Sequence, residues 1–276
     1  LGLTFLDWSC QRTDPAALPV VAEHYNGSRY AGSETCLSCH AEVWSDHLRT
    51  AHHQTSAPAS EENIDGSFAP DSNEVRVSDG IFYRMMKEDD VLYQTAYVDG
   101  HAMRKAPFDI VIGSGTKGQT YLYWSEEELR QLPISYQTAG DQWILSPGYR
   151  DNEIDFNRAA IPTCLSCHMT FTKSQEPENF FKNTYDRGQI ILGLDCESCH
   201  GPSWEHANFH LQHPEEKEAQ NMLAITSLDR QQRLDACAKC HSGLRNPKKA
   251  PFSFMTGDTL DNYSVAGYSP TRTETL

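Results

Sequence analysis

The stretch Cys36-Leu-Ser-Cys-His40 has the form C-x-x-C-H, and three later stretches repeat it. They are Cys164-Leu-Ser-Cys-His168, Cys196-Glu-Ser-Cys-His200 and Cys237-Ala-Lys-Cys-His241. We number them motifs 1 to 4 along the chain; together they use eight of the nine cysteines. C-x-x-C-H is typical of covalent attachment of c-type haem, in which both thiols bond to one porphyrin and the adjoining imidazole binds its iron.

The repetition therefore predicts four covalently attached haem c groups. The thioether bonds are expected at Cys36, Cys39, Cys164, Cys167, Cys196, Cys199, Cys237 and Cys240, and the proximal iron ligands at His40, His168, His200 and His241. Zinc is a competing interpretation, but zinc needs four ligands and usually combines two C-x-x-C units, with no reason for a histidine after each second cysteine. A redox dithiol has no use for that histidine either.

The composition fits a chain whose interior is built partly from porphyrin. Only 38% of the 276 residues are hydrophobic, which is little for a protein that must enclose four macrocycles with side chains alone. The formal net charge is −15, and haem propionates would make it more negative. Nucleic acid is excluded as a partner because its phosphates would be repelled. A basic redox partner, a cation or a mineral surface would be attracted, and acidity that merely keeps an exported protein in solution explains the charge equally well.

Thioether attachment of haem normally takes place outside the cytoplasm, so we expect a periplasmic or extracellular protein. No run of 18 or more apolar residues predicts a membrane-spanning helix. Leu1–Leu6 is compatible with the remnant of a signal-peptide apolar region. Three roles stay open for Cys10: a lipid attachment point in a poorly matching context, a bridge to another chain, or a buried thiol.

The order of patterns along the chain predicts an α+β fold with little regular structure, in which haem-binding helices flank an inserted antiparallel β region. Residues 1–30 are expected to form an N-terminal arm, and 31–276 a tetrahaem domain. Within that domain, the first haem helix should run from Ser33 to about His53, followed by a β-rich insertion over about 65–150. Short segments rich in β-branched and aromatic residues predict the strands there: Glu74–Ser78, Ile81–Met86, Val91–Val98, Phe108–Ile112, Gln119–Trp124 and Gln142–Ser146.

Turn signals support this insertion. Asp79-Gly80 and Asp99-Gly100 are typical of hairpins. Gly113-Ser-Gly-Thr-Lys-Gly118 formally matches a dinucleotide-binding pattern, but strand-like residues follow it where that pattern requires a helix. We therefore interpret it as a glycine-rich hairpin.

Residues 160–246 are expected to be helical and dense in haem, with a surface tail over 247–276. One helix should run from Cys196 to about His213, and another from Pro214 through Ala224. A third, capped at Ser227, should carry motif 4. Because three motifs fall in this part, three haems are expected close together.

The sixth ligand of each iron decides its chemistry, since a second histidine gives a low-potential carrier and an open position permits substrate binding. Eight histidines remain for four irons. His52 is the first candidate, because it follows the first haem helix and can reach a neighbouring haem; His53 is its alternative, and His47 is expected only to stack near a haem. The other candidates are His206, which follows a Gly-Pro turn and shares a helix face with His210 and His213, and then His24 and His101.

The residues described so far resemble the multihaem cytochrome c family of the cytochrome c-554 type. They also resemble the tetrahaem domain of cytochromes fused to tetratricopeptide repeats. The similarity runs from about Tyr30 to Leu260 and is carried by Gly32–His40, Thr50-Ala-His52 and Cys196–Pro202 with His206. The repeat-fused relatives add Ile112–Gly115, Thr120–Leu122, Gln131–Ile134, Ser146–Gly148 and Cys237–Ser242.

This resemblance implies electron transfer along closely packed haems, with His52 and His206 as distal ligands. The chain has no 34-residue period, so a docking role for tetratricopeptide repeats does not carry over.

Two classes of function follow. The first is a non-enzymatic carrier in which electrons hop between haems. Such a carrier is either a shuttle between redox proteins or a subunit that assembles with copies of itself into an extracellular haem filament. The filament would pass electrons to an extracellular acceptor. The second is a multihaem oxidoreductase with one five-coordinate catalytic haem, acting on a small nitrogen or sulfur compound. The surplus of histidines and the absence of a C-x-x-C-K variant favour the carrier.

Overall fold

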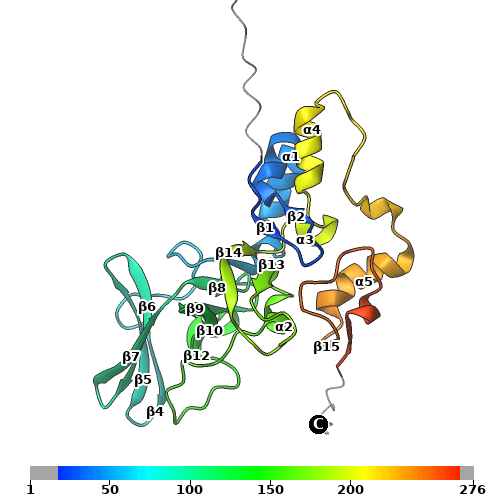
Figure 1. Ribbon diagram of the computed structural model, residues 1–276. Helices are drawn as coiled ribbons and strands as arrows, with labels where there is room; N and C mark the ends of the chain where they lie inside the picture. The colour runs from blue at the N-terminus through cyan, green and yellow to red at the C-terminus, as the bar shows by residue number, and fades with distance from the viewer. Residues whose placement is uncertain (1–17, 268–276) are drawn as a thin grey trace, which may run out of the picture.

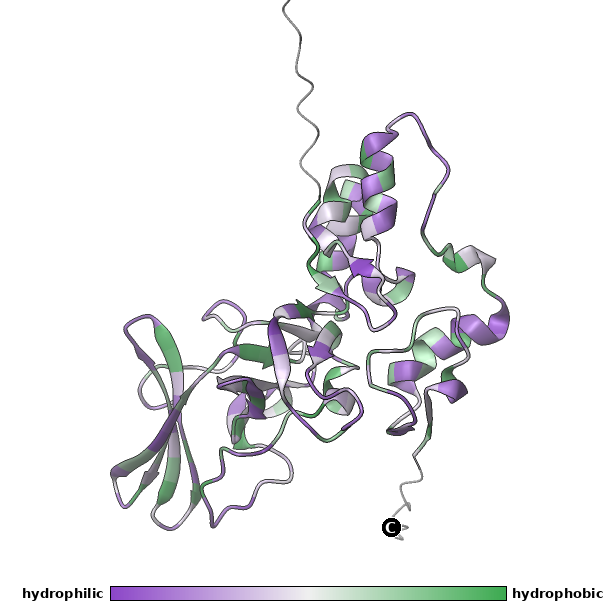
Figure 2. Cartoon of the chain, viewed as in Figure 1, coloured by the Kyte–Doolittle hydropathy of each residue, from purple (hydrophilic) through white to green (hydrophobic). Residues whose placement is uncertain are grey.

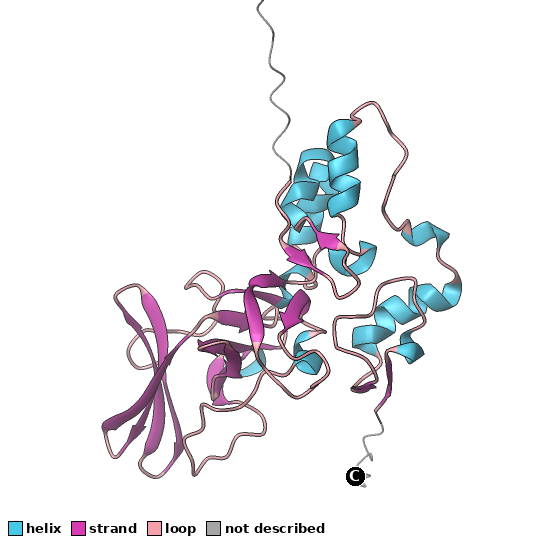
Figure 3. Ribbon diagram, in the orientation of Figure 1, coloured by secondary structure: helices cyan, strands magenta, loops and turns pink. Residues whose placement is uncertain are grey.

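A computed structural model of the protein describes residues 18–267. The strands gather at one end of the molecule and most of the helices at the other (Figures 1 and 3). The strands form several small antiparallel sheets and the helices are short, which confirms a mixed α+β architecture with low helix content. Cys10 lies outside the described residues.

A six-stranded antiparallel sheet forms the middle of the molecule. Its strands follow the order β12-β11-β9-β8-β3, with β10 paired to β9 beside this path. The bounds are β3 Ser56–Pro58, β8 Ile110–Ile112, β9 Gly118–Ser125, β10 Glu128–Gln131, β11 Ile134–Gln137 and β12 Gln142–Leu145. The segment of residues 113–117 joins β8 to β9, its antiparallel partner, so the glycine-rich stretch is the predicted hairpin.

A second sheet of four strands, β4-β5-β6-β7 in chain order, lies at the end of the molecule remote from the helices (Figure 1). It contains β4 Glu74–Ser78, β5 Ile81–Glu88, β6 Val91–Val98 and β7 His101–Pro107. The turn between β6 and β7 has positive φ at both Asp99 (49°) and Gly100 (81°), as a two-residue hairpin requires. The predicted strands of the insertion are confirmed, and β7, β10 and β11 are additions to them.

Two hydrophobic cores lie on opposite faces of the six-stranded sheet. Strand β9 contributes to both because its side chains alternate: Tyr121 and Tyr123 enter the core shared with the four-stranded sheet, and Leu122 enters the other core. This second core also takes in the hairpin of β13 Met169–Ser174 and β14 Tyr185–Leu192. The prediction that 160–246 is helical is therefore wrong for these residues, which follow motif 2 as a pair of strands.

The N-terminal arm is also corrected where the structure describes it. β1 Ala22–Glu23 pairs with β2 Arg29–Tyr30, and both Ala22 and Tyr30 are buried in the second core. Residues 18–30 are thus part of the packed body, because their apolar side chains find a partner surface on the β13–β14 hairpin.

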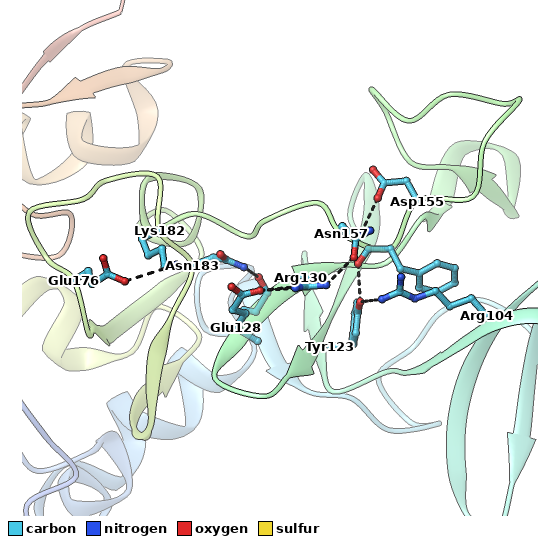
Figure 4. Close-up of polar contacts among 11 residues, drawn as sticks. Arg104, Tyr123, Glu128, Arg130, Asp155, Asn157, Glu176, Lys182 and Asn183 are labelled. Carbon is cyan, nitrogen blue, oxygen red and sulfur yellow. Dashed lines mark hydrogen bonds and ion pairs between the residues drawn. The ribbon is translucent and has the colours of Figure 1, made fainter.

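A chain of polar contacts ties the two sheets to the segment that leads into motif 2 (Figure 4). Arg104 on β7 donates to the hydroxyl of Tyr123 on β9 at 3.3 Å, and that hydroxyl donates to the carbonyl of Phe156 at 2.6 Å. Arg130 on β10 donates to Asn157 at 2.7 Å. The loop before motif 2 is therefore held on the β body by side chains from three strands.

The helices differ from the prediction mainly in where they end. They are α1 Ser33–Leu48, α2 Pro162–Leu165, α3 Cys196–His200, α4 Trp204–Gln212 and α5 Arg230–His241. The Gly201-Pro202 turn separates α3 from α4, 214–224 forms turns in place of a helix, and Asp229 caps α5 with a capping box. Within residues 18–267, no helix has the length and apolar character needed to cross a membrane.

The helices that carry motifs contribute little to either core. No residue of α1 is buried, and α5 buries only Asp235. Strands of the body carry long hydrophobic runs, whereas α4 and the loop after it are largely hydrophilic (Figure 2). Helices α1 and α5 therefore fold without a hydrophobic core of protein side chains, whereas α2 places Leu165 in the second core.

Candidate haem sites

Motifs 1 and 3 lie side by side although 160 positions separate their first cysteines. The thiols of Cys36 and Cys196 are neighbours, and their interaction raises the pKa of Cys36 and lowers that of Cys196. Helix α1, which carries motif 1, and helix α4, which follows motif 3 in the chain, are also neighbours (Figure 1). The fold thus brings the first and third attachment sites into contact.

Motifs 2 and 4 form a second pair. The Sγ atom of Cys167 lies 3.8 Å from the carbonyl oxygen of Lys239, and that of Cys240 lies 3.9 Å from the carbonyl oxygen of Ser166. The interaction between these two neighbouring thiols lowers the pKa of Cys167 to about 7 and raises that of Cys240.

The two pairs are joined through motifs 3 and 4. Burial raises the pKa of Cys199, and the neighbouring charge of Lys239 opposes this while that of Cys237 adds to it. Cys199 of motif 3 therefore lies near motif 4. Motif 1 is thus a neighbour of motif 3, and motif 4 a neighbour of motifs 3 and 2. A hydrogen bond from Thr170 Oγ1 to Asp195 Oδ1 at 3.0 Å also brings the end of motif 2 near the start of motif 3.

His52 lies opposite the proximal histidine of motif 4. The ring centroids of His52 and His241 are 6.0 Å apart, with the ring planes at 77°. Two imidazoles that share one metal through bonds of about 2 Å place their centroids about 6 Å apart. This distance is compatible with His52 and His241 holding one iron between them, and the distal role of His52 on a haem other than that of its own helix stays a prediction.

His206 lies near two proximal histidines. Burial lowers the pKa of His206, the charges of His210, His40 and His200 lower it further, and a hydrogen bond opposes them. That bond joins His206 Nδ1 to the carbonyl of Gln220 at 2.7 Å.

His200 has the same kind of contact, between its Nδ1 and the carbonyl of Leu223 at 3.1 Å. Iron-binding histidines commonly donate their second nitrogen in this way. His200 and His206 therefore both offer Nε2 to a metal.

His24 is held differently from the prediction. It is 3% exposed, and its Nδ1 and Nε2 lie 2.8 Å from Asn26 Oδ1 and 3.0 Å from the carbonyl of Phe252. Its ring also packs near Tyr30 and Phe171. With both nitrogens engaged, His24 is positioned as a core residue, and this arrangement does not support a role as distal ligand.

His101 is also placed away from the motifs. It begins β7 at the β6–β7 turn and is exposed, on the sheet farthest from the motif-bearing helices (Figure 1). No motif histidine is brought to it within one molecule, because the four-stranded sheet projects outward. The predicted distal role is therefore not supported inside the chain.

Motif 2 is fixed by the segment that follows His52. The carbonyl of His168 accepts hydrogen bonds from Thr55 Oγ1 at 2.8 Å and from Ser56 Oγ at 2.7 Å. Burial lowers the pKa of His168, which favours the neutral form that binds metals. Its Nδ1 is buried without a hydrogen-bond partner. Thus one short segment presents His52 to motif 4 and supports motif 2.

The remaining histidines of this region are His47, which was expected only to stack near a haem, and His53, the alternative to His52. His47 Nε2 bonds to the carbonyl of Leu194 at 2.8 Å, which ties α1 to the residues before motif 3. His53 Nδ1 is buried without a partner. His47 therefore has a structural contact, whereas His53 stays an alternative to His52.

The cysteines suit haem better than zinc. In the described part of the chain, no group of three or more His, Cys, Asp or Glu side chains converges as a metal site, although structural zinc needs four ligands. The motif helices instead leave apolar side chains uncovered: Val43 is 68% exposed and Leu234 47%. A porphyrin bound at each motif would cover such surfaces and supply the missing core. The fold and these sites define a multihaem c-type cytochrome.

Comparison with known proteins agrees with this class. Residues 142–201, which include motifs 2 and 3, match the family model of cytochrome c554 and c-prime. The chain is also similar to the structure titled "Crystal Structure of Outer Cell Wall Cytochrome OcwA", with a TM-score of 0.51 and 18% identity over 86% of this chain. That likeness concerns the fold, and this chain spans only 40% of the OcwA chain. No curated protein matches.

Proposed function

We propose that the protein is a tetrahaem cytochrome that carries electrons by hopping along its haems in the order of motifs 1, 3, 4 and 2. The observation that carries this proposal is the continuous series of neighbouring attachment sites: Cys36 with Cys196, Cys199 with Cys237, and Cys240 with Cys167. Thioethers at adjacent cysteines would hold adjacent porphyrins.

The axial ligands support a carrier over an enzyme. His52 faces His241, and His206 lies near both His40 and His200. Histidine on both sides of an iron gives a low-potential, low-spin centre suited to electron transfer. The protein contributes the spacing, the burial and the second ligand, and the haem supplies the change of oxidation state.

We propose an exported location, because covalent haem is attached outside the cytoplasm and a protein of similar fold is titled an outer cell wall cytochrome. The net charge of −15 favours basic redox partners or a cationic extracellular acceptor. Assembly with copies of itself into a filament is part of this proposal, and electron microscopy of the secreted protein tests it: monodisperse particles would contradict it.

The carrier function is tested by mass spectrometry and spectroscopy on the purified protein. We expect haem on the peptides of all four motifs, low-spin ferric spectra, and reduction of all four haems without binding of carbon monoxide. Peptides without haem would contradict the whole proposal. Four haems with a persistent high-spin signal and rapid carbon monoxide binding would contradict the carrier and indicate the oxidoreductase.

A further inference from the structure

Glu197 is a buried carboxylate inside motif 3, between its two cysteines. It is 2% exposed, yet its side chain is surrounded by donors. Oε1 accepts from the backbone N–H of Ala31 at 2.9 Å and from Ser203 at 2.8 Å (N–H) and 2.7 Å (Oγ). Oε2 accepts from the N–H of Gly32 at 2.9 Å. Four hydrogen bonds to one carboxylate compensate its burial.

These donors belong to the starts of two other helices. Ala31 and Gly32 directly precede α1, which has no side-chain cap of its own. Gly32 has a φ of 79°, a conformation that favours glycine, and the turn there aims two consecutive N–H groups at the same carboxylate. Ser203 directly precedes α4, which also has no side-chain cap bond. A negative charge at each helix start is stabilising.

Glu197 is not needed for its own helix. Asp195 already caps α3 by accepting from the N–H of Glu197 at 2.9 Å. The carboxylate of Glu197 is therefore directed entirely at other segments: α1, which carries motif 1, and α4, which carries His206.

We propose that Glu197 is a positioning residue that fixes the haem of motif 1 and the helix of His206 relative to the haem of motif 3. This inference rests on the proposed function, since it assigns spacing and distal ligation to a group that does not itself touch iron. Without the carboxylate, three backbone N–H groups lose their acceptor, and buried donors left unpaired drive the segments apart. Helix α4 then no longer presents His206 at a fixed place.

The test compares Glu197→Ala and Glu197→Gln with Glu42→Gln in the haem-loaded protein. Glu42 is an exposed residue of α1, so its variant removes one negative charge near motif 1 without breaking the contacts of Glu197. We expect Glu197→Ala to keep four haems by mass, to gain the high-spin band of one haem, and to change the shape of the optical redox titration. Glu42→Gln should stay low-spin and change that titration only slightly, because an exposed charge is screened by solvent.

Glu197→Gln keeps one carbonyl oxygen for Ala31 and Ser203 and loses the acceptor of Gly32, so it should load haem and give a smaller high-spin fraction. If Glu197→Ala fails to fold and attach haem, Glu197→Gln alone tests whether Glu197 positions α1 and α4. The inference is overturned where Glu197→Gln and Glu42→Gln give superimposable spectra and titrations. A wild-type protein without haem would instead contradict the proposed function. The mass of the haem-bearing peptides distinguishes these two failures.

Discussion

The haem-free chain should keep its sheets and lose its motif-bearing helices. The perturbation is the replacement of all eight motif cysteines by alanine, which prevents attachment at every site. The matched control is Cys10→Ala, which removes the ninth cysteine and leaves the motifs intact. The comparison isolates what the porphyrins contribute to folding.

The structure gives the scale of the effect. None of the 16 residues of α1 is buried, and its apolar Leu37 and Val43 are 41% and 68% exposed. Covering both with porphyrin would contribute roughly 2 kcal/mol, given about 1.5–3 kcal/mol for a fully buried aliphatic side chain. Without this contribution an isolated helix of such length is marginal in water. Helices α4 and α5, of 9 and 12 residues, are shorter and should unfold as well.

Far-UV circular dichroism and amide hydrogen exchange measure this directly. We expect the eight-alanine variant to lose most of its helical signal, with amides of α1 and α5 exchanging freely while those of β5, β6 and β9 stay protected. Cys10→Ala should behave as wild type. Equal protection of α1 and β9 amides in the haem-free chain would refute the reasoning, because α1 would then be stabilised by something other than haem.

Three further predictions follow from single residues. His52→Ala and His206→Ala should each convert one haem to high spin, seen by electron paramagnetic resonance, and an unchanged spectrum would remove that histidine as a ligand. His24→Ala should leave the haem spectrum unchanged but lower the free energy of unfolding by about 2–4 kcal/mol, since a buried ring and two hydrogen bonds are lost; a new high-spin signal would contradict its core role. Burial, and then the charge of Glu197, raise the pKa of Asp195 to about 7, so the folded state keeps a proton that the unfolded chain releases near pH 4. The free energy of unfolding should therefore fall as pH rises from about 4 to 7, by roughly 1.4 kcal/mol per pH unit. Asp195→Asn, which can still cap α3, should remove this pH dependence when unfolding is measured in urea. The same pH dependence in the variant would show that other groups cause it.

The strands of the insertion could be predicted because their signals are local. Alternating β-branched and aromatic residues, with the Asp79-Gly80 turn between them, specify the pair β4–β5 from neighbouring sequence alone. The first haem helix and the Gly-Pro break after motif 3 are local in the same sense. Each of these elements needs only residues a few positions apart.

Other elements depend on contacts that no local pattern contains. Residues 169–192 form β13 and β14 because they complete a core with Tyr30 and Phe252, both far away in sequence. The sequence offered His24 as a ligand, but its Nε2 is hydrogen-bonded to the carbonyl of Phe252, which lies 228 positions further along the chain. Such outcomes depend on long-range packing, which overrides local preference.

The order of the haem sites is the clearest case of this kind. Sequence order places motif 2 between motifs 1 and 3, whereas the fold inserts the β13–β14 hairpin after motif 2 and returns the chain to α1. Glu197 then joins the start of α1 to motif 3, and the segment after His52 reaches motif 2. Electron hopping depends on which sites are neighbours in space, so the proposed conducting path would depend on these few long-range polar contacts more than on the motifs themselves.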